Sequence, residues 1–363
     1  MVVKTLSLTD FRNYTNAEIA FFEGVNLIYG KNAHGKTNIL EALWLFTGAK
    51  SFRTNQDSEM IRFSASEAHV KTEFSAFSRA QTAEITISGG RKKLVKLGGA
   101  PLRRTSEILG QFPAVIFSPD ELHIITGAPE VRRRFMDSAI SAAKPLYYSA
   151  LHTYIRNWKQ KNALLKNNPK KEELTVWNEK MAEAGARVMQ YRSAFFESLA
   201  PFASEMHRMV AGKDEALSVL YAPSAPLGDS VESQTELLYT ALMKKADAEM
   251  YAGLSLVGPH RDEIRFLIDG KDARAFASQG QMRTAAVSVK VAEGRLFEEE
   301  TGEAPAVFLD DILGELDRER RTLLLESLAK NQVLLTCTER EAVTLSGAVR
   351  YFEVLEGTVC TSI

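Results

Sequence analysis

Hydrophobic and polar residues alternate near the start of the chain and then change to a helical spacing. The alternation predicts three short strands, at residues 3–8, 18–22 and 25–29. A glycine-containing loop follows, after which Ile39, Leu43 and Phe46 recur on one helix face. Residues 68–97 alternate again around Gly89-Gly90, which predicts an antiparallel meander.

The middle of the chain has the apolar spacing of long helices. Apolar residues recur every three or four positions in two series, Leu146, Ala150, Tyr154 and Trp158, then Trp177, Met181, Ala184, Val188, Tyr191 and Phe195. Residues 167–169 read Asn-Asn-Pro and stop the first helix. We expect two helices of about 25 residues in an antiparallel hairpin roughly 35 to 40 Å long. The Tyr154 and Trp158 rings lie on the apolar stripe, which favours core packing over stacking on nucleic-acid bases.

An α/β pattern returns after residue 254. Residues 306–309 form a short apolar run, a helix containing Leu323, Leu324 and Leu328 follows, and residues 333–335 form another strand. Two α/β stretches are thus separated by a largely helical insertion.

Composition narrows the class of protein. The chain has 363 residues, of which 45% are hydrophobic and 25% charged, as in soluble globular proteins. The two cysteines, Cys337 and Cys360, provide neither a disulfide framework nor a Cys-x-x-Cys zinc site. No secretory signal or long apolar span is evident. We therefore expect a protein of a reducing compartment, the cytoplasm, and exclude secreted, membrane-spanning, collagenous and disordered classes.

The formal net charge of −1 hides two basic segments that contain no acid. Residues 91–104 carry six Lys/Arg, and residues 138–171 carry seven. Such segments indicate an anionic partner, although a solvated surface also produces them. If the anion is DNA, contacts are expected on both segments, in the second at Lys159, Lys161, Lys166, Lys170 and Lys171, with residues 132–134 as further candidates.

The strongest chemical signal is a complete G-x-x-x-x-G-K-[ST] motif between a strand and a helix. This motif, the P-loop, comprises Gly30, Lys31, Asn32, Ala33, His34, Gly35, Lys36 and Thr37. In this context backbone N–H groups surround a phosphate, Lys36 binds the β/γ-phosphates, and the Thr37 hydroxyl ligates Mg²⁺. The motif predicts binding of ATP or a similar nucleotide with Mg²⁺.

A second strand ends in acids suited to the metal. Asp310 follows residues 306–309 and is predicted to hold Mg²⁺, directly or through water, while Asp311 polarises the attacking water. Together with Asp317, these acids have the spacing of the Walker B motif and D-loop of ATP-binding-cassette proteins. The predicted catalytic residues are Lys36, Asp310 and Asp311.

Ser278-Gln279-Gly280-Gln281 opens a predicted helix. Ser followed by Gln three residues later is typical of a capping box, and the same helix start can bind an anion through Ser278, Gly280 and Gln281. Val287, Val289 and Val291 alternate with period two, so the local pattern also allows a strand.

These motifs together resemble the head domain of SMC-type ATP-binding-cassette ATPases and, within that superfamily, the RecF family of bacterial recombination and repair proteins. The blocks that match are residues 10–14, 50–54, 117–120, 132–137, 257–262 and 278–281. The resemblance extends over residues 1–340.

The resemblance implies an α/β, ABC/SMC-type P-loop ATPase head with a largely helical insertion. We expect an ATPase lobe I from residues 1–118 and 254–363, and a helical lobe II from residues 119–253 with a short antiparallel hairpin. It further implies binding to single-stranded and gapped or duplex DNA, cooperation with RecO and RecR in loading RecA, and support of replication and the SOS response. ATP would drive homodimerisation, and slow, DNA-stimulated hydrolysis would drive release.

Several positions leave alternatives open. Arg12 and Asn13 either approach the nucleotide, as in related heads, or form a plain β-turn. His260 and Arg261 lie near nucleotide or DNA, or belong to a buried structural cluster. Asp311 stands where related proteins have Glu, which implies slow hydrolysis. Neither a histidine switch after residue 335 nor a Q-loop glutamine is identifiable.

Two other functions also fit the P-loop. A transporter-type or metabolic ATPase would leave the basic hairpin unexplained. A nucleotide-binding scaffold without hydrolysis would differ from a switch only in phosphate release, with and without DNA.

Overall fold

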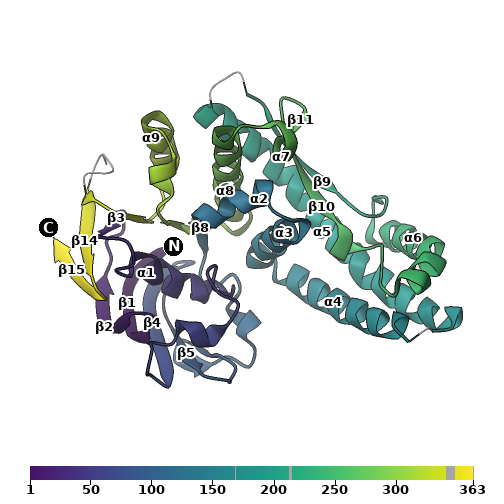
Figure 1. Cartoon of the computed structure of the whole chain (residues 1–363), viewed down its shortest axis with the longest axis horizontal. Helices are drawn as coiled ribbons and strands as arrows, with labels where there is room; N and C mark the ends of the chain where they lie inside the picture. Colours follow the sequence, from purple (N-terminus) through teal and green to yellow (C-terminus); the bar gives the residue numbers. More distant parts are fainter. Residues whose placement is uncertain (168, 212–214, 341–347, 363) are drawn as a thin grey trace. The chain divides into compact units, whose positions relative to one another are not determined.

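The computed structural model describes residues 1–167, 169–211, 215–340 and 348–362. The chain divides into two compact units, Met1–Glu121 with Glu293–Ile363, and Leu122–Ala292 (Figure 1). Among the described residues, no helix combines the length and the hydrophobicity that a membrane span requires. This division groups residues 254–292 with the helical segment. The two units are compact groups of residues and do not by themselves identify the ATPase lobes. The assignment of lobes I and II therefore stays a prediction.

The first unit contains a largely parallel sheet with the strand order β15-β14-β3-β13-β12-β8. Its strands are β3 (Val25–Tyr29), β8 (Ala114–Phe117), β12 (Ala306–Leu309), β13 (Val333–Cys337), β14 (Val349–Leu355) and β15 (Thr358–Ser362). All residues of β12 and β13 are buried, because parallel strands in the middle of a sheet are covered on both faces. The strands predicted at 25–29 and 306–309 are confirmed. β14 and β15 are additional.

A second, antiparallel sheet has the order β2-β1-β4-β5-β6-β7. Its strands are β1 (Val2–Phe11), β2 (Tyr14–Ala20), β4 (Glu67–Ala76), β5 (Arg79–Ser88), β6 (Leu94–Leu97) and β7 (Ala100–Pro101). The predicted meander over 68–97 is confirmed. The strand predicted at 18–22 instead begins at Tyr14, because a tight turn at Arg12-Asn13 pairs Phe11 with Tyr14.

Helix α1 (Lys36–Trp44) shares one hydrophobic core with inward residues of both sheets. Ile39, Leu40 and Leu43 of α1 are fully buried. Helix α9 (Arg318–Ser327) lies between β12 and β13 in the chain. The core therefore anchors the helix that follows the P-loop.

The second unit is mainly helical. Its elements are α2 (His123–Thr126), α3 (Pro129–Ala143), α4 (Pro145–Leu165), α5 (Lys171–Ala211), β9 (Leu217–Ala222), α6 (Val231–Ala252), β10 (Glu263–Ile268), β11 (Lys271–Asp272) and α7 (Ala273–Phe276). Helix α8 (Gln279–Thr301) begins in this unit and ends in the first. Strands β11, β10 and β9 form a small antiparallel sheet.

The predicted helical hairpin is present as α4 and α5 (Figure 1). Helix α5 has 41 residues, more than expected, because its buried face continues beyond Phe195 and past Pro201 to Val210. Tyr154 is 1% exposed, which confirms core packing of its ring. At Gly185 of α5 an added Cβ would lie 2.7 Å from Leu238 Cδ2 of α6, so a larger residue there would require the Leu238 side chain to shift.

Candidate nucleotide site and helical arm

Strand order brings the predicted ATPase motifs together at one edge of the parallel sheet. The P-loop follows β3 and Asp310 follows β12, and β13 lies between these two strands. Carboxyl ends of parallel strands meet at the same edge, which is where open α/β sheets bind ligands. Thr336, near the carboxyl end of β13, therefore lies between the two motifs.

The P-loop is shaped for close backbone approach. Gly35 has φ of 115° and Gly30 has φ of 149°, values that favour glycine. The Lys36 ammonium is buried and donates hydrogen bonds to the carbonyls of Gly30 (2.7 Å) and Lys31 (3.2 Å). The ammonium thus lies inside the loop at the start of α1.

Thr37 and Asp310 are in direct contact across the sheet edge. The Thr37 hydroxyl donates to Asp310 Oδ1 at 2.9 Å, and Thr336 donates to the same oxygen at 2.9 Å. Burial raises the pKa of Asp310, and the two hydroxyl donors partly offset that rise. The Thr37 oxygen keeps its lone pairs, so these residues fit Mg²⁺ bound jointly by protein and phosphate oxygens.

Within the described residues, no cluster of three His, Cys, Asp or Glu side chains forms a metal cage. Mg²⁺ shared with a nucleotide does not need such a cage. Asp311 next to Asp310 has a left-handed backbone, with φ of 52°, and its N–H donates to Thr336 Oγ1 at 2.9 Å. Asp317 of the D-loop-like segment caps α9 by accepting from the Arg320 N–H.

Two segments hold the P-loop from outside. The β1–β2 turn does so through Asn13, which donates to the His34 carbonyl at 2.7 Å, and through Tyr14, which donates to the Gly35 carbonyl at 2.9 Å. The β14–β15 hairpin contributes the Gly357 N–H, which donates to the His34 carbonyl at 3.1 Å. A Cβ on Gly30 would lie 2.4 Å from the Val354 carbonyl oxygen. Sequence reasoning missed this hairpin, which follows the segment that carried the family resemblance.

Arg12 is engaged by a buried carboxylate of α1. Its guanidinium makes two hydrogen bonds, of 2.8 and 2.6 Å, to Glu41, which also accepts from Ser51. Arg53 donates to Asn38, and Asn38 donates to Asn13. The Arg12-Asn13 turn is therefore both a β-turn and part of the P-loop's support, and a direct nucleotide contact by Arg12 stays a prediction.

The Ser278–Gln281 segment has the predicted capping box. Gln281 N donates to Ser278 Oγ (3.2 Å), and Ser278 N donates to Gln281 Oε1 (2.9 Å). Helix α8 follows, with Val287, Val289 and Val291 all buried, so the strand alternative is wrong. Ser278 is exposed and Gly280 partly exposed, which leaves the helix start accessible.

The lysines predicted to bind DNA lie on the helical arm, which is formed by α4, α5 and the residues between them, and they divide into two groups. Lys159, Lys166, Lys170 and Lys171 are exposed, although Lys171 also pairs with Asp247 at 2.9 Å. Lys161 has no exposed surface and pairs with the equally buried Glu249 at 2.6 Å. Burial lowers the pKa of Lys161, and Glu249 opposes that effect. A DNA phosphate has no access to this ammonium, so the prediction that Lys161 binds DNA is wrong.

Other basic candidates are also compensated by acids distant in sequence. Arg132 is 3% exposed and makes a bidentate pair with Glu263, so it is not an available DNA contact. In the 91–104 segment, Lys93 pairs with Asp57 at 3.1 Å and Lys96 with Glu84 at 3.4 Å. Segments without acids in sequence are therefore not free of acids in space.

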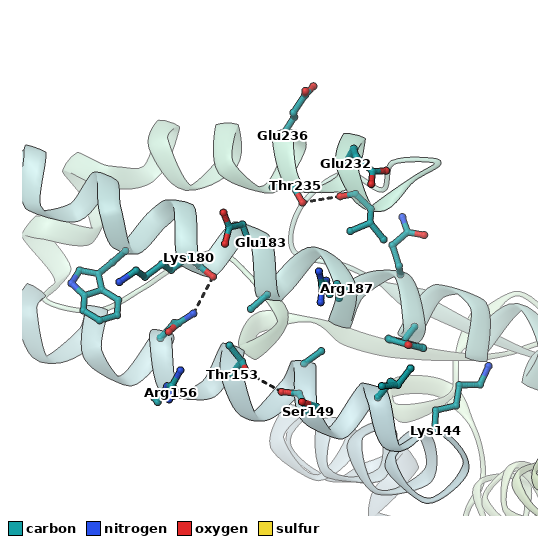
Figure 2. Close-up of a pocket in the computed structure, with 18 of the residues that line it drawn as sticks. Lys144, Ser149, Thr153, Arg156, Lys180, Glu183, Arg187, Glu232, Thr235 and Glu236 are labelled. Carbon is teal, nitrogen blue, oxygen red and sulfur yellow. Dashed lines mark hydrogen bonds between the residues drawn. The ribbon is translucent and has the colours of Figure 1, made fainter.

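A groove of about 1460 Å³ opens along α4, α5 and α6 (Figure 2). Its lining includes basic and acidic side chains, namely Lys144, Arg156, Lys180, Arg187, Glu183, Glu232 and Glu236. This mixture does not favour a phosphate backbone along the whole groove. The exposed lysines from Lys159 to Lys171 remain the better DNA candidates.

His260 belongs to a buried structural cluster. Its Nδ1 bonds the Tyr154 hydroxyl at 2.6 Å, its Nε2 bonds the Ser255 carbonyl at 3.1 Å, and its ring stacks on Trp158. A carbonyl only accepts, so Nε2 carries a proton. Burial lowers the pKa of His260 to about 4. Of the alternatives for His260, the geometry favours the structural one.

The carboxyl group of Asp262 is also buried. It accepts from Arg192, from the Tyr221 hydroxyl and from the Ser224 N–H, and Arg192 in turn pairs with Asp137. Arg261 donates to the Ser255 carbonyl. The segment around residues 257–262 therefore organises the interior of the second unit.

Comparisons with known proteins agree with this geometry. The family model described as RecF/RecN/SMC N terminal domain matches residues 2–358. The chain is 35% identical over 368 residues to the DNA replication and repair protein RecF of Ruminiclostridium cellulolyticum, covering 99% of each, and 37% identical over 377 residues to RecF of a Synechococcus species, covering 100% of this chain and 98% of that protein.

Solved structures show the same relationship. One described as the recombination mediator protein RecF-ATPrS in the RecFOR pathway has a TM-score of 0.92 and 34% identity, and the match covers 99% of this chain and 97% of that one. An Smc head domain from Pyrococcus furiosus, 17% identical with a TM-score of 0.58, shares the fold over 99% of this chain and 96% of that one. With its P-loop, the strand that ends at Asp310 and the Ser278–Gln281 segment on an SMC-type ATPase head, the chain belongs to the RecF family of DNA replication and repair proteins.

Proposed function

We propose that the protein is an ATP-dependent DNA-binding switch of recombinational repair. The observation that carries this proposal is the contact between Thr37 and Asp310, made by two motifs 273 positions apart in sequence. A P-loop hydroxyl bonded to a strand-end carboxylate is the arrangement that P-loop ATPases use for Mg²⁺. That a RecF structure is described as bound to ATP supports the same ligand here.

In this proposal each residue has a definite role. Backbone N–H groups of residues 30–37 and the Lys36 ammonium bind the β/γ-phosphates, and Thr37 and Asp310 hold Mg²⁺. The metal would neutralise charge on the β- and γ-phosphate oxygens. Asp311 orients the attacking water, and its side chain is one methylene shorter than the Glu of related proteins. Hydrolysis is consequently slow.

DNA is bound by the exposed lysines of the arm, Lys159, Lys166, Lys170 and Lys171, at single-strand gaps or in duplex DNA. The RecFOR pathway of the solved relative supports RecO and RecR as partners, with RecA loading, replication support and SOS induction as consequences. We further propose that the protein acts in the cytoplasm, on the nucleoid.

ATP also joins two copies of the chain. The exposed start of α8, with Ser278, Gly280 and Gln281, contacts the γ-phosphate bound by a partner's P-loop, so two ATP molecules lie in a two-fold interface. Loss of the γ-phosphate removes that contact. DNA-stimulated hydrolysis therefore releases the dimer and its DNA.

Lys36→Arg tests the ATPase. A planar guanidinium is larger than the ammonium held by the Gly30 and Lys31 carbonyls, so phosphate release should fall at least tenfold while some ATP affinity remains. Phosphate release is measured with and without gapped DNA. Unchanged turnover in the variant would remove the P-loop from the mechanism, and a wild type without turnover under either condition would identify a non-hydrolysing scaffold.

A further inference from the structure

Thr336 lies at the edge of the parallel sheet where the predicted ATPase motifs meet. No histidine switch could be assigned to this part of the chain from the sequence. It is the fourth residue of β13, the strand between β3 and β12, and 1% of its surface is exposed. Its hydroxyl therefore bonds to protein groups and not to solvent. Those groups are the two acids of the Walker B segment.

Both bonding capacities of this hydroxyl are used. Thr336 Oγ1 donates to Asp310 Oδ1 at 2.9 Å and accepts from the Asp311 backbone N–H at 2.9 Å. A hydroxyl is both donor and acceptor, whereas a carboxylate only accepts and an ammonium only donates. Serine and threonine are therefore the side chains of suitable size that make both bonds here.

The second bond supports an unusual backbone. Asp311 has φ of 52° and ψ of 8°, a left-handed conformation that costs a residue with a Cβ some free energy, although Asp tolerates it better than most. The Thr336 hydroxyl binds the N–H of that same residue. It thereby sets the direction in which the Asp311 side chain leaves the main chain.

We propose that Thr336 is the positioning residue of the hydrolytic site. One hydroxyl orients the metal-binding carboxylate of Asp310 and the water-orienting Asp311, so the two acids keep a fixed relation to Thr37 and the P-loop. This inference rests on the proposed ATPase function. Thr336 acts through its neighbours and is not itself a catalytic residue.

The test compares Thr336→Val with Thr336→Ser. Valine has nearly the same shape but no hydroxyl, and serine keeps the hydroxyl but lacks the methyl group. We expect Thr336→Val to lower kcat for ATP at least tenfold and to raise the Mg²⁺ concentration for half-maximal rate, with KM for ATP changed less than about threefold. Thr336→Ser should retain most of the wild-type kcat.

Thr72→Val is the matched control. Thr72 is fully buried in β4 of the same unit, and its hydroxyl donates to the Thr5 carbonyl at 2.8 Å, away from the Walker B acids. It should lower thermal stability without a selective loss of kcat. An equal loss of kcat in Thr72→Val and Thr336→Val would mean general destabilisation and overturn the proposal.

A second readout does not depend on turnover. The melting temperature is measured with ATP plus EDTA and with ATP plus Mg²⁺, and Thr336→Val should lose most of the additional shift that Mg²⁺ produces in the wild type. Wild-type behaviour of the valine variant in both measurements, or a serine variant as impaired as valine, would overturn the proposal. If the wild type has no ATPase activity, the proposed function fails, while the melting shift still decides the role of Thr336 in holding Asp310.

Discussion

Single side chains in this protein take their chemistry from burial as much as from residue type. His260 is an ordinary histidine in sequence, yet in the fold it is a neutral ring bonded by Tyr154 and Ser255. Protonation would place a charge in a desolvated site beside the Arg261 and Lys161 cations. The ring therefore acts as a structural acceptor and donor near neutral pH.

This environment predicts a pH-dependent stability. The pKa of His260 is about 4 in the folded state, below its usual 6.5, so the unfolded state binds the proton first as pH falls. The free energy of unfolding therefore does not depend on this group above about pH 6.5, and it decreases as the pH falls from 6.5 toward 4. We expect the wild type to lose about 2 kcal/mol between pH 7.5 and 5 from this group alone.

His260→Gln removes the titrating group but keeps an amide that can accept from Tyr154 and donate to Ser255. Urea unfolding of both proteins at pH 7.5 and pH 5 isolates the histidine, because the other titrating groups are common to both. Equal losses of unfolding free energy in wild type and variant would contradict a depressed pKa of His260.

Among the elements, α4 carries one lysine on its exposed face and another on its buried face. Lys159 and Lys161 are two positions apart, which separates them by about 200° around the helix axis. Lys159 is exposed, whereas Lys161 faces Glu249 of α6 inside the second unit. The Ser255 hydroxyl and the Leu256 N–H also bind Glu249, so this carboxylate holds the end of α6 to the segment that follows.

We expect the loss of Lys161 to affect stability and the loss of Lys159 to affect DNA binding. Lys161→Met leaves the Glu249 charge buried without its cation and should lower the free energy of unfolding by roughly 3 kcal/mol. Lys159→Met should change it by less than about 0.5 kcal/mol. Instead, it should weaken DNA binding and flatten the dependence of log affinity on log salt by about 0.9.

Urea denaturation and DNA titrations at several salt concentrations measure both variants. Weaker DNA binding by Lys161→Met at unchanged stability would contradict its burial. An unchanged salt slope in Lys159→Met would make this part of α4 a solvated surface.

For the whole molecule, the proposed function predicts that ATP joins two copies of the chain. Ser278 caps α8, so a test of its role in the dimer must preserve the cap. Aspartate is as good an N-cap as serine, but its charge repels a γ-phosphate. Arginine loses the cap and opposes the helix dipole.

We therefore expect the wild type to be dimeric with ATP and monomeric with ADP, and Ser278→Asp to be monomeric with either nucleotide. Monomer ATP affinity and stability should stay near wild type in Ser278→Asp, whereas Ser278→Arg should lose the dimer together with some stability. Light scattering measures the mass in each state. A wild type that remains monomeric at saturating ATP, or a Ser278→Asp dimer, would contradict the two-fold sandwich.

Local sequence patterns were sufficient to predict many of the elements and motifs of this molecule. The P-loop between β3 and α1, the buried run at 306–309 and the capping box at Ser278 each depend on residues within one short segment. Backbone hydrogen bonding and hydrophobic periodicity act over such distances, so these features are readable without any tertiary information. The resemblance to SMC-type heads rests on the same motifs, and the resemblance to the RecF family rests on further short blocks such as residues 257–262.

Other features arise from pairings between distant segments. The order of strands in a parallel sheet is not written in any one strand, so the insertion of β13 between the P-loop strand and β12, which brings Thr336 to Asp310, emerged only with the fold. The same holds for the β14–β15 hairpin against Gly30 and for the burial of Lys161. A charged residue is exposed or buried according to what packs over it, and that partner lies 88 positions away in the case of Lys161 and Glu249.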